Sequence, residues 1–226
     1  MRPRSGTRGG RGEGRIGRAP GGPVSRSPRI AAPPLPRRFY ARPPTVVARA
    51  LLGRLLVHDR GRARLVGRIV EVEAYGGARD PASHAYRGET ARNRTMFGSP
   101  GHAYIYFTYG MHHCLNVVAG RPGRACAVLI RALEPLAGLA AMARRRGISD
   151  RHRLARGPGC VAEALGLSRA QDGVDLTRDR LWLPDLPARR GGWRITRSRR
   201  IGITRGAERA WRFFLAGHPC VSARPS

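Results

Sequence analysis

One ten-residue stretch constrains the fold of this chain more than any other. Residues 66–75 read V-G-R-I-V-E-V-E-A-Y, a run rich in β-branched residues that is typical of a β-strand. Successive side chains of a strand point to opposite faces. Glu71, Glu73 and Tyr75 therefore share one face, and the opposite face is mostly apolar. The strand places two carboxylates and an aromatic ring on the same wall.

These two glutamates allow two interpretations. A carboxylate on a rigid strand beside an aromatic ring suits a general base, provided that its surroundings fix it and partly bury it. The alternative is that Glu71 and Glu73 line a solvated face, as polar residues do on half-buried strands. The alternation of this strand alone favours the solvated face. It also does not say which of the two glutamates a catalytic role would select.

Arginine dominates the charge of the chain. The 226 residues carry 43 basic side chains against 14 acidic ones, which gives a formal net charge of +29, and the sequence contains no lysine. Such an excess indicates a polyanionic partner, in the first place nucleic acid. A mechanism through a lysine Schiff base is excluded, which leaves only the α-amino group of Met1 for that role.

Composition also divides the chain. Residues 1–34 are mainly Arg, Gly, Pro and Ser with almost no large apolar side chains, which predicts a disordered basic tail. Residues 35–226 are long enough for one domain with its own core. No apolar run approaches the ~20 residues that span a bilayer, so we expect no membrane partner. The cysteines form no C-x-x-C pair, so we expect reduced thiols.

Periodicity and turn residues predict an α+β fold. The predicted helices are residues 45–52, a helix that starts at Glu134–Pro135, and a short helix that follows G-P-G at 157–159 and ends at Leu165. The predicted strands besides 66–75 are two that meet at Tyr109–Gly110 within 103–119, followed by 125–131, 200–204 and 211–215. Residues 76–99 show no sustained period and form a long predicted loop, which in a compact domain is usually functional.

Two local features are candidate contacts to nucleic acid. Tyr109 is a large aromatic at a turn tip, where small polar residues are usual. Gly157 and Gly159 flank the start of a predicted helix, and a helix N-terminus can cradle a phosphate, although most Gly–Pro turns are only turns. His112 and His113 fall on opposite faces of their strand, so we expect no metal site there.

Several motifs taken together resemble one known family. The stretches are V-E-V-E-A-Y at 70–75, R-N-R-T-M-F…Y-I-Y-F-T-Y-G-M…C-L-N within 92–116, L-I-R-A-L-E-P at 129–135, G-P-G at 157–159 and R-I-G-I at 200–203. They are similar to the alkyladenine DNA glycosylases, the mammalian-type 3-methyladenine DNA glycosylases that also occur in bacteria. The resemblance covers about residues 35–222. It implies a curved antiparallel β-sheet flanked by helices, with a β-hairpin that inserts into DNA.

The resemblance also implies residue roles. Glu73 matches the general base that activates a water, and Arg131 matches the arginine that orients it. The other matched positions are Tyr75, His84 and Tyr106 as walls for the extruded base, Asn116 as the side chain that excludes guanine, Tyr109 as the wedge in the duplex, and Ala82 and Ile201 as positions whose backbone carbonyls lie near the water. Cys160 departs from the family, because a lysine commonly follows G-P-G there.

The expected function is that of a monofunctional DNA-3-methyladenine glycosylase. Such an enzyme rotates alkylated or deaminated purines out of duplex DNA and hydrolyses the N-glycosidic bond, which leaves an abasic site. The resemblance implies no cofactor and no metal, damaged double-stranded DNA as the partner, a monomer, and the bacterial cytoplasm at the nucleoid. The alternative is a non-catalytic nucleic-acid-binding module on the same scaffold. That module would bind DNA in a salt-sensitive way without releasing purine.

Overall fold

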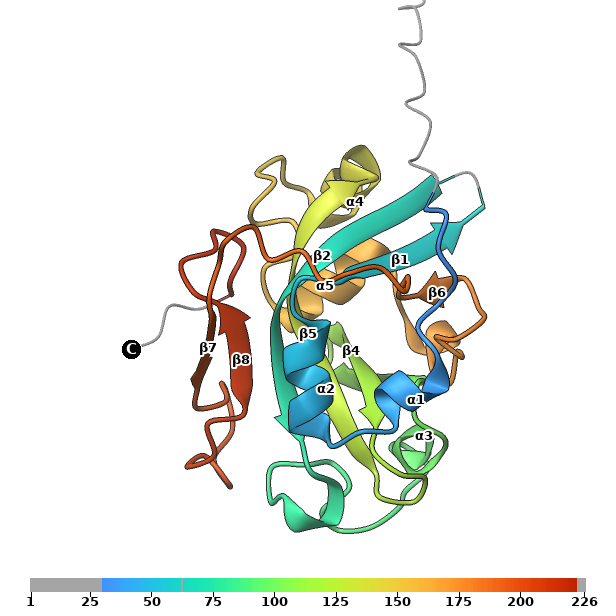
Figure 1. The fold of residues 1–226 in the computed structure, drawn as a ribbon, viewed down its shortest axis with the longest axis vertical. Coiled ribbons are helices and arrows are strands. Elements are labelled where there is room, and N and C mark those ends of the chain that lie inside the picture. Colours follow the sequence, from blue (N-terminus) through green and yellow to red (C-terminus); the bar gives the residue numbers. More distant parts are fainter. Residues whose placement is uncertain (1–29, 62, 223–226) are drawn as a thin grey trace, which may run out of the picture.

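Strand β2 (Ala63–Tyr75) runs through the middle of the sheet and pairs with three other strands (Figure 1). In the computed structural model, which describes residues 30–61 and 63–222, β5 (Cys126–Ala137) follows one edge of β2. On the other edge, β1 (Leu55–Arg60) pairs with the first half of β2 and β8 (Arg212–Leu215) pairs with the second half. Segments that are distant in the sequence therefore meet where β2 carries its two glutamates.

The sheet is antiparallel throughout. Its order is β3-β4-β5-β2-β1-β6, and β7 pairs with β8 at the side. The remaining strands are β3 (Ala103–Thr108), β4 (His112–Ala119), β6 (Leu181–Trp182) and β7 (Ile195–Ser198). The described residues form a single α+β domain around this curled sheet, which confirms the predicted fold class.

Short helices pack around the sheet. They are α1 (Arg37–Tyr40), α2 (Pro44–Leu51), α3 (Arg94–Phe97), α4 (Leu139–Arg146) and α5 (Pro158–Leu165), with 3-10 turns η1 (Gly77–Arg79) and η2 (Arg169–Gln171). Helix α2 lies against β2 and β5. Helix α5 lies against β4 and β5, and α4 packs against α5 (Figure 1). None of the helices in the described part of the chain has the length and apolar character that a membrane crossing requires.

Burial overturns the solvated-face interpretation of the glutamates. Glu71 and Glu73 are both fully buried, as are their apolar neighbours Val70 and Val72. Both faces of this half of β2 are covered. On the glutamate side the cover comes from the Ile201 backbone in the loop after β7, from the Arg212 side chain of β8 and from Ser222. Alternation within one strand could not reveal that cover, because it comes from residues more than 120 positions away.

The helix predicted to start at Glu134–Pro135 starts later. Strand β5 continues through Pro135 to Ala137, with Glu134 opposite Arg68 in the sheet. Gly138, at φ +77°, then turns the chain into α4. The ladder with β2 and the 2.7 Å Arg68–Glu134 ion pair outweigh the local preference of Pro for a helix start.

The strand predicted at 200–204 is also wrong. The strand in this region is β7, which ends at Ser198, and residues 199–211 are irregular. Arg200 does not continue the strand, because its side chain turns inward to a buried carboxylate, Asp80. The predicted strand at 211–215 is confirmed as β8.

The predicted tail falls mostly outside the described residues, which begin at Ile30. At its end, Pro33 accepts a backbone hydrogen bond from Asp185, and Pro34 forms a bridge with Pro184. These contacts attach the start of the described chain to the segment that follows β6.

Replacing Gly77 tests the packing of the turn that follows β2. Gly77 has φ +66°, and a Cβ atom there would collide with the backbone oxygen of Arg124. Gly88 also has positive φ, at +94°, but has open space around it. We expect Gly88→Ala to lower the free energy of unfolding by about 1–2 kcal/mol from backbone strain alone. Gly77→Ala should lose a further 1–3 kcal/mol, roughly, from the collision. Denaturant titration measures both, and equal losses would contradict this packing.

Candidate active site

An aromatic cavity of about 410 Å³ opens beside the glutamate face of β2. It is lined by side chains from the sheet and by the loops before α3 and after β7. Eight of the positions nominated from the sequence line it: Tyr75, Ala82, His84, Tyr106, Tyr109, Asn116, Arg131 and Ile201. Glu73 contacts three of these residues and lies behind them. The sequence-based set thus comes together at one place.

Glu73 is held by three donors. Its Oε1 accepts a hydrogen bond from the backbone N–H of Ile201 at 2.8 Å. Its Oε2 accepts from the hydroxyl of Tyr75 at 2.9 Å and lies 3.3 Å from Nη1 of Arg131. A carboxylate has about four lone-pair sites. Glu73 therefore keeps one site free to accept from a further donor, such as a water molecule.

Glu71 is held by more donors than Glu73. Its Oε1 accepts from Nε of Arg131 at 3.0 Å, from Nε of Arg212 at 2.8 Å and from the Ser222 hydroxyl at 2.8 Å. Its Oε2 accepts from the Ser222 backbone N–H at 2.6 Å. Burial by itself raises the pKa of Glu71, but Arg131, Arg212 and the Ser222 N–H outweigh burial and hold that pKa below its ordinary value. Three of these donors lie on Oε1 and one on Oε2. With four hydrogen bonds, against two hydrogen bonds and one ion-pair contact for Glu73, Glu71 is better suited to a structural role.

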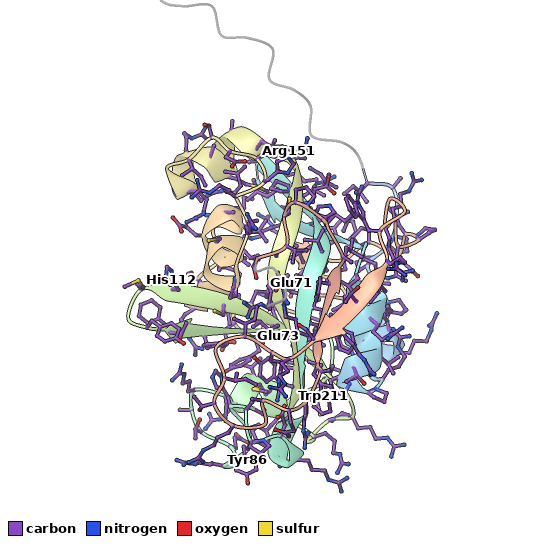
Figure 2. All side chains as sticks on the ribbon, turned by 90° about the vertical axis from the view of Figure 1, so that its left-hand side faces the viewer. Glu71, Glu73, Tyr86, His112, Arg151 and Trp211 are labelled. Carbon is purple, nitrogen blue, oxygen red and sulfur yellow. The ribbon has the colours of Figure 1, made fainter. Side chains whose placement is uncertain are left out.

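Arg131 connects the two glutamates. Its side chain is 7% exposed and extends from β5, so that Nε faces Glu71 and Nη1 faces Glu73. Burial lowers the pKa of Arg131, but the two carboxylates outweigh burial and raise that pKa above its usual value. Figure 2 shows the two glutamates one above the other at the centre of the molecule. Arg131 thereby fixes the carboxylate that lies next to the cavity.

Aromatic rings form the wall opposite Glu73. The rings of His84 and Tyr106 meet edge to face with centroids 4.4 Å apart, and Nδ1 of His84 lies 3.1 Å from the hydroxyl of Tyr104. Burial raises the pKa of Tyr104 to about 12, and burial together with Cys114 raises the pKa of Tyr106 further. Loss of solvent contact, with Arg92 nearby, lowers the pKa of His84. The wall is therefore uncharged at neutral pH.

Asn116 lines the cavity from strand β4. It is 4% exposed, and its Nδ2 donates to the backbone oxygen of Tyr104 at 3.2 Å. That hydrogen bond crosses from β4 to β3, where Asn116 and Tyr104 are paired in register. The amide is thus fixed in position at the cavity wall.

The β3–β4 hairpin carries its aromatic tip away from the body. Tyr109 is 81% exposed and Met111 is 69% exposed, and His112 marks the hairpin projecting sideways in Figure 2. Tyr109 has φ +52°, and the Met111 N–H donates to the Thr108 oxygen at 3.2 Å to close the turn. This conformation costs a residue other than glycine roughly 1–2 kcal/mol. An exposed aromatic held at such a cost is typical of a binding element.

Helix α5 begins beside the cavity. Pro158 lines the cavity between Gly157 and Gly159, and the Gly157 N–H donates to the backbone oxygen of Arg131 at 3.0 Å. Gly157 has φ +122°, a conformation that favours glycine. The two glycines flank the cavity without lining it.

Several residues of the site were not foreseen. Tyr104 could have been found, because it shares a strand face with Tyr106. Arg212 left a weak signal, a charge within the apolar run W-R-F-F-L. Asp80 and Ser222 left none. Among residues 30–61 and 63–222, no three His, Cys, Asp or Glu side chains cluster as metal ligands would.

An aromatic cavity with a buried carboxylate behind its wall is a candidate active site that suits a flat ring. Comparison with known families agrees with this class. The methylpurine-DNA glycosylase (MPG) family model matches residues 38–219. The chain therefore belongs to the methylpurine-DNA glycosylase family.

Curated relatives are similar over most of their length. A protein of Chlorobaculum tepidum is 47% identical over 188 residues, which cover 81% of this chain and 88% of the relative. One of Burkholderia cenocepacia is 50% identical over 195 residues, with 83% and 90% covered. One of Methanoculleus marisnigri is 48% identical over 192 residues, with 84% and 99% covered. All three bear the name "Putative 3-methyladenine DNA glycosylase".

Replacing Glu71 tests its structural role. Glu71→Gln leaves Arg212 buried beside a neutral partner, so we expect the free energy of unfolding at pH 7 to fall by about 3–5 kcal/mol. Because the folded-state pKa of Glu71 is lowered, its contribution is present above its ordinary pKa of 4.5 and is lost as pH falls below that value. The difference in the free energy of unfolding between wild type and Glu71→Gln should become smaller below pH 4.5. Denaturant titrations from pH 7 to pH 3 measure it, and a constant gap would refute this role.

Proposed function

We propose that this chain is a DNA glycosylase that hydrolyses the N-glycosidic bond of damaged purines in duplex DNA and leaves an abasic site. The 3-methyladenine type is the proposed substrate class, which is what the names of the relatives suggest. The single observation that carries the proposal is the buried Glu73 carboxylate, fixed by three donors beside an aromatic cavity with one acceptor site left.

Access to a base inside a duplex requires that its nucleotide rotate out of the stack. Unstacking costs a few kcal/mol, and an aromatic that fills the gap offsets part of this cost. Tyr109 is the candidate wedge, because it is exposed at a projecting tip and lines the mouth of the cavity. Gly157 and Gly159 at the start of α5 are the proposed phosphate site. The Gly157 N–H is already donated to the Arg131 oxygen and Pro158 has no N–H, so the Gly159 N–H would be the phosphate donor.

The extruded purine would stack in the cavity against Tyr75, Tyr106 and His84. An alkylated purine such as 3-methyladenine is positively charged, and the ring faces favour it by roughly 0.5–2 kcal/mol through cation–π attraction. Asn116, whose amide is held by the Tyr104 backbone oxygen, would crowd the extra amino group of guanine. Selection thus combines stacking for damaged purines with steric exclusion of an undamaged one.

Glu73 would act as the general base. A water bound at its free acceptor site gives up a proton to the carboxylate as the water oxygen bonds to C1′ of the sugar. The bond from C1′ to the purine nitrogen breaks, and its electron pair leaves with the base through an oxocarbenium-like state. A positioned base contributes typically ~10²–10⁴-fold. The Ile201 N–H holds the carboxylate. The backbone carbonyls of Ile201 and Ala82, two residues that line the cavity, would lie near the water.

The absence of lysine favours a monofunctional reaction, because strand cleavage by an imine route needs an amine. A cationic alkylated base departs as a neutral molecule and needs no acid. A deaminated base needs a proton, and the raised pKa values of the tyrosines make the cavity wall a poor source. We propose that the enzyme acts as a monomer on bacterial nucleoid DNA.

Glu73→Gln tests the mechanism and its alternative together. Gln can still accept from the Ile201 N–H but cannot take a proton, so we expect release of 3-methyladenine from methylated duplex to fall at least ~10²-fold. Binding to lesion-containing duplex should stay within about threefold. Single-turnover chromatography of free purine and a binding titration measure the two quantities.

The matched control is Glu163→Gln, which removes a half-exposed glutamate paired with Arg146 away from the cavity. Its rate should equal that of wild type. Wild-type protein that binds damaged duplex but releases no purine would instead identify a binding module. A Glu73→Gln variant with an unchanged rate would remove Glu73 from the mechanism.

A further inference from the structure

A second buried ion pair lies beside the site and has no part in the mechanism above. Nη2 of Arg200 donates to Oδ1 of Asp80 at 2.8 Å, and Nη1 donates to Oδ2. Both side chains are fully buried. Asp80 follows η1, whereas Arg200 follows β7. The pair therefore joins the two loops that close the cavity on this side.

Each partner also binds backbone next to the site. Asp80 accepts from the N–H groups of Gly76 at 3.0 Å and Ala82 at 3.3 Å. Arg200 donates to the backbone oxygens of Ala74 and Gly206, each at 3.0 Å. The pair thus ties together the end of β2, the loop with Ala82 and the loop with Ile201.

Two of the three donors to Glu73 depend on the position of Arg200. The Ile201 N–H is the donor to Oε1, and Ile201 is the residue after Arg200 in the chain. The guanidinium carbon of Arg200 also lies 4.8 Å from the ring centroid of Tyr75, whose hydroxyl is the donor to Oε2. A shift of Arg200 would move both donors.

Stability alone is a poor reason for this pair. A buried ion pair often stabilises a fold no better than apolar side chains of the same volume, because both charges must leave water. Arg200 in addition buries Nε with no hydrogen-bond partner among the described residues. The contacts around Glu73 point instead to a role in fixing the donors to that carboxylate.

We propose that Asp80 and Arg200 are positioning residues for the glycosylase reaction. They hold the Ile201 N–H and the Tyr75 ring so that Glu73 keeps one orientation and its free acceptor site faces the cavity. This proposal rests on the proposed function of the same site. It assigns neither residue any contact with the base or with the water.

The first test compares Arg200→Met and Asp80→Asn with wild type in single-turnover release of 3-methyladenine. We expect the rate to fall roughly 10–100-fold, as for other residues that orient a reacting group, while affinity for lesion-containing duplex changes less than about threefold. The rate of Arg200→Lys should lie between those of wild type and Arg200→Met, because an ammonium keeps the charge but cannot make the two-pronged contact with Asp80.

The matched control is Arg37→Met, which breaks the 2.6 Å pair with Asp175. Like Asp80, Asp175 is buried and accepts a backbone N–H, but neither Arg37 nor Asp175 lines the cavity. Its rate should match wild type. An Arg200→Met rate equal to wild type, or a loss that returns fully on cooling to a temperature where the variant is folded, would overturn the positioning role.

A second readout does not require activity. In the full chain, the Ile201 amide should exchange its hydrogen at least tenfold faster in Arg200→Met than in wild type, while strand β4 keeps its protection. Unchanged protection at Ile201 would overturn the inference. If wild-type protein released no purine, the proposed function would fail, and exchange at Ile201 would still decide whether the pair positions that amide.

Discussion

Two carboxylates on one strand are buried in this protein, and the rest of the site depends on how their charge is balanced. Glu71 and Glu73 point to the same side of β2, and Arg131 lies against both. Two carboxylate charges on one face of a strand repel each other in a dry interior. Arg131, with Arg212 behind Glu71, removes that penalty. The glutamates then differ in their remaining donors, and that difference supports the proposal that Glu73 is the one that takes part in the reaction.

The use of arginine for every cation suits this arrangement. A guanidinium stays charged in any accessible pH range and offers a planar fork of donors. Arg131 uses different nitrogens for its two carboxylates, and Arg200 uses its fork on Asp80 while its other contacts reach backbone. A lysine offers one point of charge and could not span the same partners. The buried contacts at the centre of the fold therefore use the several donors that arginine has and lysine lacks.

The sequence allowed correct predictions where a local pattern or a matched motif determines the structure. The central strand, the hairpin at Tyr109 and the helix after G-P-G are all present. The errors fall where distant residues decide: β5 runs past Glu134 because it pairs with β2, and Arg200 leaves a strand to reach Asp80. The residues of the sequence do not distinguish Glu71 from Glu73, because the donors that separate them come from elsewhere in the chain. Motif resemblance selected Glu73, and the donor geometry supports that choice without testing it.

The dependence of Glu71 on Arg212 and Ser222 affects the order in which the molecule can be completed. These donors lie 141 and 151 positions after the carboxylate they satisfy. A ribosome releases them long after the central strand has emerged, and until then Glu71 lacks three of its four hydrogen bonds. Sheet pairing of such separation is slow to form. The nascent chain therefore cannot bury Glu71 with its full set of donors until residues 212–222 have been synthesised, so the central strand reaches its final environment late.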